Sequence, residues 1–321
     1  MDGDVRVLIT GAAGFVGQHL SRLIIADNDD IELHGTVYSE NEFPPQVGID
    51  YHAIDLCDPD ATTALMHKLQ PQEIYHLAAM ASTSESFEHP WRTFEANSRI
   101  QMNLLESCKT LSEKPRFLVA SSAVVYGPTK PHEQPITEAA PFRPTNAYSL
   151  SKITQDMMAL QYFYSDGIPT IRARAFNHLG PGQRTSFVAP DFAYQIAKIE
   201  VKKQAPVMRV GNLSAARDFT DVRDVARAYM ALMKHGEAGT AYNIASNNTY
   251  TIQTLLDTLL AFTNTDINVT VDADRLRPVD VSEVRGDYSR LHTHTNWEPL
   301  IPFEQSLREL LDDCRQRVQQ L

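Results

Sequence analysis

The chain has 321 residues, a formal net charge of −11 at pH 7, and 43% hydrophobic and 21% charged residues. These values are typical of globular proteins, and the length suits one large α/β domain or a cofactor domain with a smaller companion. Lys and Arg form no block along the sequence. An acidic chain of this kind repels phosphate-rich polymers, which argues against nucleic acid as a partner.

The sequence also lacks the usual signals for membranes and secretion. A membrane-spanning helix needs about 20 apolar residues in a row, and no apolar run in the sequence is nearly that long. The N-terminus becomes charged at once, through Asp2, Asp4 and Arg6, which is not the layout of a signal peptide. We therefore expect no membrane partner and a cytoplasmic location. The cysteines are odd in number and far apart, so they are expected to be free thiols: Cys57, Cys108 and Cys314.

Short β-rich runs alternate with helical patterns through the first half of the chain. The expected strands are Val5–Thr10, Glu32–Val37, Tyr51–Ile54, Glu73–Leu77, Arg116–Ser121 and Thr170–Ala175. The expected helices are Phe15–Ile25, Ala61–Leu69, Ile100–Leu111 and Ser151–Tyr164. Asp58 ahead of Pro59 predicts the cap of the second helix. This alternation predicts an α/β fold with a doubly wound parallel sheet.

A Gly/Pro turn at 180–182 ends this regular rhythm. Later elements are expected over Phe192–Lys203, Val207–Gly211, Asp221–Lys234, Ala241–Ile244, Ile252–Ala261, Asn268–Asp272 and Phe303–Val318. We expect residues 1–176 and 214–246 to form a cofactor-binding domain. Residues 177–213 and 247–321 are expected to form a smaller, C-terminal α/β domain that binds the substrate.

A glycine-rich turn links the first strand to the first helix. Gly11, Gly14 and Gly17 follow an apolar strand directly and open an amphipathic segment. Glycines let the backbone bend sharply and approach a pyrophosphate, which then lies at the positive N-terminus of the helix. In this context the motif predicts a Rossmann-type dinucleotide site. The cofactor contacts expected in the turn are Gly11, Ala13, Gly14, Phe15, Val16 and Gly17.

Two later segments fit the same cofactor. Asp55 and Leu56 follow the third strand, where an acid would lie near an adenine ring, and the small residues Leu77-Ala78-Ala79 end the next strand beneath the cofactor. His76 is expected to be a packed or hydrogen-bonded histidine, not a catalyst. The second strand ends in Thr36-Val37-Tyr38-Ser39, with neither an acid for a ribose hydroxyl nor an Arg for a 2′-phosphate. We expect NADP or NAD, with NADPH favoured because no acid excludes its phosphate.

The pattern of three side chains predicts a site for proton transfer. Tyr148 and Lys152 stand four residues apart and therefore share one helix face. An ammonium beside a phenol favours phenolate, so we expect a lowered pKa for Tyr148. Ser122 comes at the end of the strand expected at Arg116–Ser121, where its hydroxyl could bind the substrate oxygen that Tyr148 protonates.

Over essentially its whole length the sequence resembles the extended short-chain dehydrogenase/reductase family, in its NAD-dependent epimerase/dehydratase group. The resemblance implies that Ser122, Tyr148 and Lys152 are the catalytic set, working with NAD(P) on a nucleotide-linked sugar. It also implies a homodimer, joined through helices such as those at Ile100–Leu111 and Ser151–Tyr164.

Three segments are similar to the GDP-mannose branch of that family, and most similar to its GDP-4-dehydro-6-deoxy-D-mannose reductases. These segments are Phe176–Gln183, Val210–Phe219 and Leu276-Arg277-Pro278. The similarity implies that Asn177, Arg217 and Arg277 contact the sugar nucleotide, together with Ser122. Guanidinium groups suit this role because they bind diphosphate oxygens bidentately.

The type of reaction is predicted from a difference. Dehydratases of this family carry an acidic or polar-acidic pair directly after the Ser or Thr, whereas this chain has Ala123 and Val124. Dehydration is therefore disfavoured, and we expect reduction of the C4 keto group of a GDP-linked 4-keto-6-deoxy sugar to give GDP-D-rhamnose. The alternative is a C4 epimerase with tightly bound NAD, and a non-catalytic scaffold is least favoured. No metal site is expected. His292 and His294 form a close histidine pair, but no Cys or acidic cluster of ligand spacing accompanies them.

Overall fold

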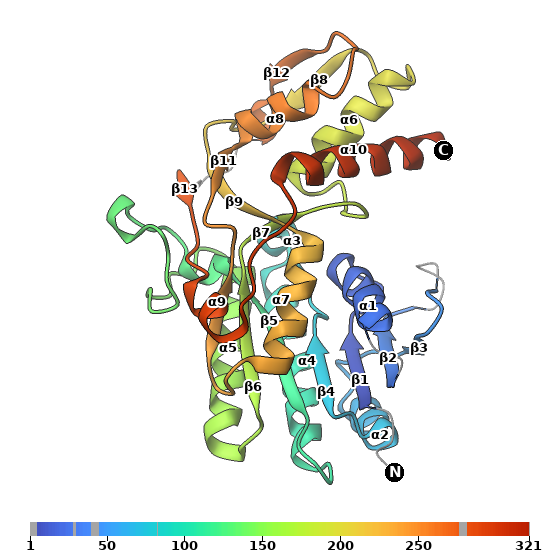
Figure 1. The fold of residues 1–321 in the computed structure, drawn as a ribbon, viewed down its shortest axis with the longest axis vertical. Coiled ribbons are helices and arrows are strands. Elements are labelled where there is room, and N and C mark those ends of the chain that lie inside the picture. The colour runs from blue at the N-terminus through green and yellow to red at the C-terminus, as the bar shows by residue number, and fades with distance from the viewer. Residues whose placement is uncertain (1–4, 28–29, 40–44, 82, 276–280, 321) are drawn as a thin grey trace.

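A computed structural model describes residues 5–27, 30–39, 45–81, 83–275 and 281–320 (Figure 1). Its main feature is a seven-stranded sheet in the order β10-β6-β5-β4-β1-β2-β3, in which every neighbouring pair is parallel. The strands are β1 (Val5–Thr10), β2 (Ile31–Val37), β3 (Asp50–Ala53), β4 (Glu73–His76), β5 (Arg116–Ser122), β6 (Thr170–Ala175) and β10 (Ala241–Ile244). The predicted α/β class and Rossmann-type sheet are confirmed.

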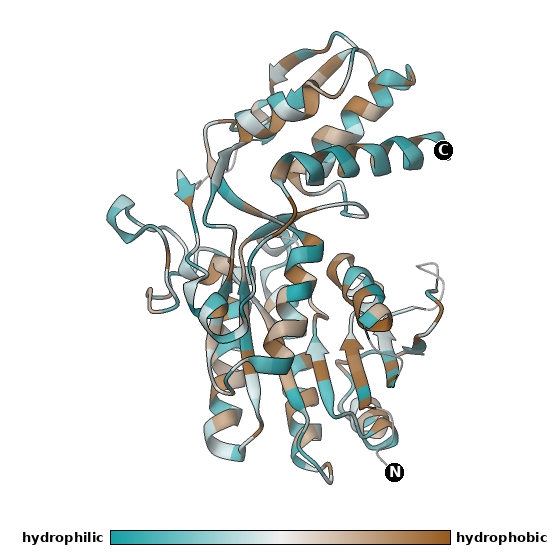
Figure 2. Cartoon of the chain, in the orientation of Figure 1, coloured by the Kyte–Doolittle hydropathy of each residue, from teal (hydrophilic) through white to brown (hydrophobic). Residues whose placement is uncertain are grey.

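The central strand β1 is apolar and buried on both faces of the sheet. In β1, Val7, Leu8 and Ile9 are all almost fully buried although their side chains alternate in direction. Figure 2 shows β1 in brown, whereas the terminal helix α10 (Phe303–Gln319) carries mostly hydrophilic residues. Burial of both faces requires helices on both sides of the sheet.

Two sets of helices provide this cover. On one face α1 (Phe15–Asp27) packs beside α7 (Val222–His235), and both share a core cluster with the sheet. The second face is covered by α2 (Pro59–Leu69), α4 (Pro90–Lys109) and α5 (Ala147–Asp166).

The helix termini follow local capping chemistry. The Asp58 carboxylate accepts hydrogen bonds from the first-turn N–H groups of α2, as predicted from the sequence. The helix α4 begins ten residues earlier than predicted, at Pro90, a residue that suits the first turn of a helix. Likewise α5 begins before its predicted start, because Asn146 and Ser149 cap each other there.

The later part of the chain builds a second core. Its helices are α6 (Val188–Glu200), α8 (Ile252–Leu260) and α10, which pack on one another. Two small sheets flank them, one made of β8 (Val207–Val210) and β12 (Asn268–Val271), the other of β7 (Asn177–Leu179), β9 (Ala216–Asp221), β11 (Thr249–Thr251) and β13 (Glu283–Val284). Leu291 and Trp297, around α9 (Ser289–Thr295), pack instead into the core of the large sheet. The segment around α9 thus departs from the remainder of residues 247–321.

Within the described ranges, no helix combines the length and the apolar character needed to cross a bilayer. Cys57, Cys108 and Cys314 are unbridged. The remaining short elements are α3 (Thr83–Glu88) and the 3-10 turns η1 (Ala123–Tyr126), η2 (Pro131–Glu133) and η3 (Ala273–Arg275).

Candidate active site

The glycine-rich turn brings three segments of backbone into close contact. Gly11 has φ +70°, and a Cβ on it would lie 3.0 Å from the Cα of Ala78. A Cβ on Gly17 would lie 2.5 Å from the carbonyl oxygen of Gly11. Side chains at these two positions would therefore force the turn away from β4 and from α1. The glycines leave a backbone cradle at the N-terminus of α1, where unpaired N–H groups attract an anion.

Thr10 joins the turn to the end of β4, a role that the sequence analysis missed. Its hydroxyl accepts hydrogen bonds from the N–H groups of Leu77 and Ala78, each 3.1 Å long, and lies 2.8 Å from Nδ1 of His76. One side chain thus fixes the floor of the predicted cofactor site. The available signal was a hydroxyl residue closing an otherwise apolar strand immediately before Gly11.

Ser122, Tyr148 and Lys152 come together from β5 and α5. The Ser122 hydroxyl, at the carboxyl end of β5, interacts with the Tyr148 phenol, and it also accepts a hydrogen bond from the Val124 N–H. The Lys152 ammonium lies 6.0 Å from the centre of the Tyr148 ring. Among the described residues it donates one hydrogen bond, of 2.9 Å, to the Ala120 carbonyl.

The pKa of Tyr148 moves in the opposite direction to our prediction. Burial raises the pKa of Tyr148 to about 12, and the Ser122 hydroxyl offsets only part of this rise. Burial also lowers the pKa of Lys152 to about 8, because the charged form loses its hydration. Burial thus sets the direction of the Tyr148 pKa, which favours the protonated phenol.

Behind this set lies a buried group of uncharged polar side chains. Gln155 donates to the Asn97 carbonyl and lies 3.3 Å from Nε2 of His76, while Asn97 donates to Ser151 and binds the Met80 backbone. Burial, reinforced by Lys152, lowers the pKa of His76 to about 3. His76 is therefore a neutral, hydrogen-bonded histidine, as predicted. Asn97 was not predicted from the sequence. Its signal was a polar residue on the buried face of α4.

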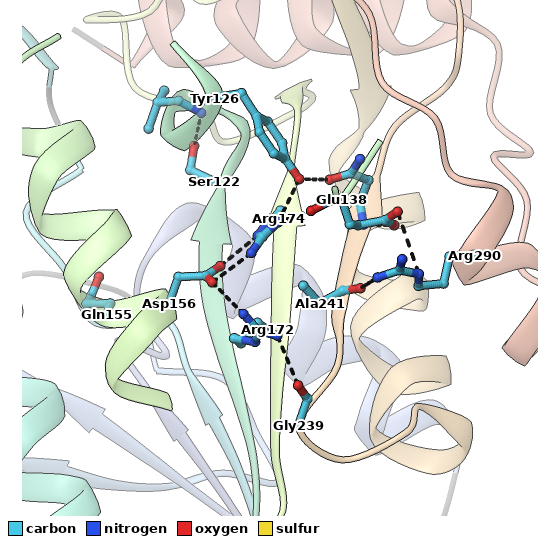
Figure 3. Close-up of polar contacts among 12 residues, drawn as sticks. Ser122, Tyr126, Glu138, Gln155, Asp156, Arg172, Arg174, Gly239, Ala241 and Arg290 are labelled. Atoms are coloured by element: carbon cyan, nitrogen blue, oxygen red, sulfur yellow. Dashed lines mark hydrogen bonds and ion pairs between the residues drawn. The ribbon is translucent and has the colours of Figure 1, made fainter. Parts of the chain in front are cut away.

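One turn beyond Lys152, α5 carries a second buried charge (Figure 3). The Asp156 carboxylate accepts hydrogen bonds of 2.8 and 2.9 Å from Arg174 and one of 3.0 Å from Arg172. Arg174 also donates to Tyr126, at the end of η1. Burial alone would raise the pKa of Asp156, but the two guanidinium groups outweigh it and leave that pKa below its usual value. These bonds tie α5 to β6 and to the turn after β5.

The remaining predicted cofactor residues lie around the same end of the sheet. Gly14 is exposed in the turn, the Ala13 carbonyl accepts a bond from Gln18, and the Phe15 ring stacks on His178 with centres 6.0 Å apart. Val16 is half-buried in the first turn of α1. Asp55 is exposed after β3 and Leu56 is buried, whereas Ala79 is half-buried after β4.

The predicted substrate residues are spread over the second core. Asn177 is exposed at the start of β7, and Arg217 lies on β9, where it donates to the carbonyls of Ala216 and Val281. Register pairing sets Asn177 beside Phe219 on the same small sheet. Arg277 falls outside the described residues.

Similarity to known proteins identifies the family of this chain. Residues 8–310 match the profile of the family described as GDP-mannose 4,6 dehydratase. The chain belongs to this family. It is 36% identical to GDP-6-deoxy-D-mannose reductase of Pseudomonas aeruginosa, with 98% of this chain and 99% of that protein covered. It is also 26% identical to GDP-mannose 4,6 dehydratase 1 of Arabidopsis thaliana, covering 95% of this chain and 88% of the relative.

Solved structures agree with this family assignment. The P. aeruginosa protein RMD, solved in complex with NADPH, superposes with a TM-score of 0.86 at 34% identity. The match covers 98% of this chain and all of the solved one. The extended short-chain dehydrogenase/reductase resemblance stated above is thereby confirmed.

This member of the GDP-mannose 4,6 dehydratase family lacks acid–base side chains at the two positions after Ser122, where elimination of water would need them. Ser122 is followed by Ala123, which is buried, and by Val124, and neither side chain can move a proton. Loss of water across a C–C bond needs a general base and a general acid at the reacting carbons. The set of Ser122, Tyr148 and Lys152 can bind a carbonyl oxygen and give it a proton.

Proposed function

We propose that this protein is an NAD(P)H-dependent reductase of the C4 keto group of a nucleotide-linked 4-keto-6-deoxy sugar. The favoured substrate is GDP-4-dehydro-6-deoxy-D-mannose, and the product is GDP-D-rhamnose. The observation that carries the proposal is the hydrogen bond between Tyr148 and Ser122, with Ala123 and Val124 where elimination would need acid–base groups. The 36% identity to the P. aeruginosa reductase supports the same substrate.

The chain's residues have the following roles in this reaction. A reduced nicotinamide, when bound, supplies the hydride. Ser122 donates a hydrogen bond to the C4 oxygen and orients the carbonyl. As the C=O π bond breaks, the oxygen takes the proton of the Tyr148 hydroxyl, which leaves a phenolate. The Lys152 ammonium stabilises that phenolate, and solvent later restores the proton.

The cofactor is proposed to lie on the glycine cradle. Its pyrophosphate would meet the backbone at Gly11, Gly14 and Gly17, where a Cβ would lie only 3.0, 3.0 and 2.5 Å from other backbone atoms of the turn and of the end of β4. An ammonium has three donors, and Lys152 uses one on the Ala120 carbonyl, so it can also bind ribose hydroxyls. NADPH is favoured because the end of β2 carries no acid, and the P. aeruginosa protein was solved with NADPH.

The sugar nucleotide is proposed to lie between the two cores. Residues 1–176 and 214–246 would bind the cofactor, and residues 177–213 and 247–321, apart from the segment around α9, would bind the substrate. Asn177, Arg217 and Arg277 are the proposed contacts. Two guanidinium groups suit a diphosphate because each can donate two parallel hydrogen bonds.

The decisive experiment combines the purified protein, NADPH, GDP-mannose and a separate GDP-mannose 4,6-dehydratase. We expect one NADPH oxidised per product and GDP-D-rhamnose identified by NMR. Without the partner dehydratase, GDP-mannose should stay unchanged, since this chain lacks the groups for elimination. Catalysis of C4 inversion with no net change in added cofactor would instead establish the epimerase alternative and overturn the proposal.

A homodimer through α4 and α5 is also proposed. Leu150, Met157 and Tyr164 follow one another at seven-residue intervals on α5 and are 45%, 44% and 77% exposed. This spacing gathers them on one helix face, which a second copy could cover. Light scattering at micromolar concentration should give twice the chain mass. Met157→Asp should halve that mass, whereas Val271→Asp, at another exposed apolar residue, should not.

A further inference from the structure

An unassigned cluster of imidazole and carboxylate groups joins β2 to the edge strand β3. His34 lies on β2, and Asp50 and His52 lie on β3, with His34 paired to Asp50 and Thr36 paired to His52. Because parallel partners and alternate residues of a strand share a face, the three side chains project together. Nδ1 of His34 lies 3.2 Å from Nε2 of His52, and one Asp50 oxygen lies 3.6 and 3.7 Å from these nitrogens.

These separations match the face of a metal coordination tetrahedron. Ligand atoms about 2.1 Å from a tetrahedral zinc ion lie about 3.4 Å from one another. The three observed edges, 3.2, 3.6 and 3.7 Å, lie on either side of this value. His34, Asp50 and His52 could therefore bind one ion with little movement, leaving the fourth position for water.

The surroundings orient the ligands as metal sites commonly require. The His34 side chain is only 3% exposed, and its second nitrogen, Nε2, lies 3.1 Å from a Glu32 carboxylate oxygen. This contact lacks hydrogen-bond geometry, and Nε2 has no other hydrogen-bond partner among the described residues. The Glu32 carboxylate is therefore near enough to accept from Nε2 once a metal on Nδ1 places the proton there. Asp50, by contrast, is 69% exposed, which gives an ion access from solvent.

We propose that His34 Nδ1, His52 Nε2 and the Asp50 carboxylate bind one divalent transition-metal ion of the zinc class. Two imidazoles and one carboxylate favour zinc, cobalt, nickel or copper over magnesium or calcium, which prefer oxygen ligands. The ion fastens the edge strand β3 to β2 at one end of the sheet order (Figure 1). Its role is structural, because His34 pairs through the sheet with Leu8, two residues before the end of β1, and not with the turn that follows.

The site is tested by metal binding to the whole chain, prepared without a histidine tag and stripped with a chelator. Titration calorimetry with zinc should give one saturable equivalent. Cobalt at the same stoichiometry should give the visible absorption of a tetrahedral N/O site. Asp50→Asn and His52→Gln should each weaken zinc binding at least tenfold. Both replacements nearly keep side-chain volume. Asp50 is 69% exposed, so Asp50→Asn spares the fold, whereas His34 is only 3% exposed and is not replaced.

Matched controls separate this site from nonspecific binding. His292→Gln alters the other close histidine pair, and Asp60→Asn alters an exposed acid on α2. Both should bind zinc like the parent. Equal binding by Asp50→Asn and the parent, or no saturable binding by the parent, would overturn the proposal. Neither readout uses the reductase assay, so the two proposals stand or fall separately.

Discussion

Two buried charges lie one turn apart on α5, and the structure treats them differently. Lys152 is 5% exposed, and one backbone carbonyl accepts from its ammonium. Asp156 is fully buried and meets two guanidinium groups through three hydrogen bonds. Burial therefore lowers the pKa of Lys152 to about 8, whereas Arg174 and Arg172 overcome the effect of burial on Asp156.

The difference separates chemistry from positioning on a single helix. The Lys152 ammonium has unused hydrogen-bond donors and a lowered pKa. It can therefore donate to a ligand or stabilise a developing phenolate. The Asp156 carboxylate is already bound by two arginines, so it is not available to a ligand. Its ion pairs hold α5 against β6 (Figure 3). The predictions below test this division, beginning with the largest expected effect.

Tyr148→Phe should give the largest loss of activity. The change removes the proton donor and leaves both buried charges in place. We expect kcat to fall about 10²–10⁴-fold, the range typical of a lost general acid, with the thermal midpoint little changed. Steady-state NADPH oxidation with the keto sugar measures this. Tyr164→Phe, on the same helix but 77% exposed, should keep full activity. A fully active Tyr148→Phe protein would mean that the proton comes from elsewhere.

Asp156→Asn should give the largest loss of stability. It keeps the side-chain volume but leaves Arg172 and Arg174 without their carboxylate. Breaking a buried ion pair in this way costs about 3–5 kcal/mol, which urea denaturation can measure. Asp166→Asn, near the exposed end of the same helix, should cost far less. If Asp156→Asn is as stable as the parent but loses kcat as Tyr148→Phe does, the division between positioning and chemistry is wrong.

Replacing both arginines and the acid together provides a second test of the ion cluster. In Asp156→Leu/Arg172→Met/Arg174→Met no charge is left unpaired. Apolar replacement of a whole buried ion cluster is often neutral or stabilising. The triple variant should therefore regain much of the stability that Asp156→Asn loses. A triple variant less stable than Asp156→Asn would mean that packing, and not unpaired charge, causes the loss.

Lys152→Met should stabilise the cofactor-free protein at neutral pH. The pKa of Lys152 is about 8 when folded, against about 10.4 in an unfolded chain. Below pH 8 both states are charged, and the folded state bears the full cost of burying the charge, about 3 kcal/mol. Between pH 8 and 10.4 the folded lysine is neutral while the unfolded one still binds a proton. This cost therefore disappears as pH rises.

The measurement compares unfolding free energies of parent and variant from pH 7 to 10.5. The advantage of Lys152→Met should shrink towards zero across this window. Lys130→Met, at an exposed lysine, should show no such trend. A constant difference at every pH would locate the effect in packing and would contradict the contrast with Asp156.

Much of the fold could be predicted because the local signals and the packing agree. The strands at Val5–Thr10 and Thr170–Ala175 have the predicted bounds. The first is mostly apolar, whereas the second also buries Arg172 and Arg174, which pair with Asp156. The start of α4 was missed by ten residues, because the residues that its first turns bury are the polar Thr93 and Asn97, which give no apolar period. The small sheet around β9 pairs segments remote in sequence, and two- or three-residue strands have no periodicity to detect.

The site divides in the same way. Gly11 and the Tyr148–Lys152 pair follow from spacing, because glycine and helix geometry act locally. Thr10 and Asn97 depend on partners 66 to 68 and 17 to 54 residues away, so their roles required the tertiary structure. The direction of the pKa of Tyr148 was predicted wrongly, because helical spacing reveals a neighbouring charge but not the depth of burial.

Ser122→Ala should have the smallest of these effects and should act on catalysis alone. Ser122 accepts one 3.3 Å bond from Val124 and interacts with Tyr148, so its removal leaves the Asp156 cluster intact. Losing one hydrogen bond to the carbonyl oxygen should lower kcat about 10–100-fold, less than losing the proton itself. Ser122→Thr keeps the hydroxyl and should recover most of the rate, since a structural defect would not respond to that group. Equal rates for the Ala and Thr variants would show that the hydroxyl does not act on the substrate, and the chemistry would then rest on Tyr148 and Lys152 of α5 alone.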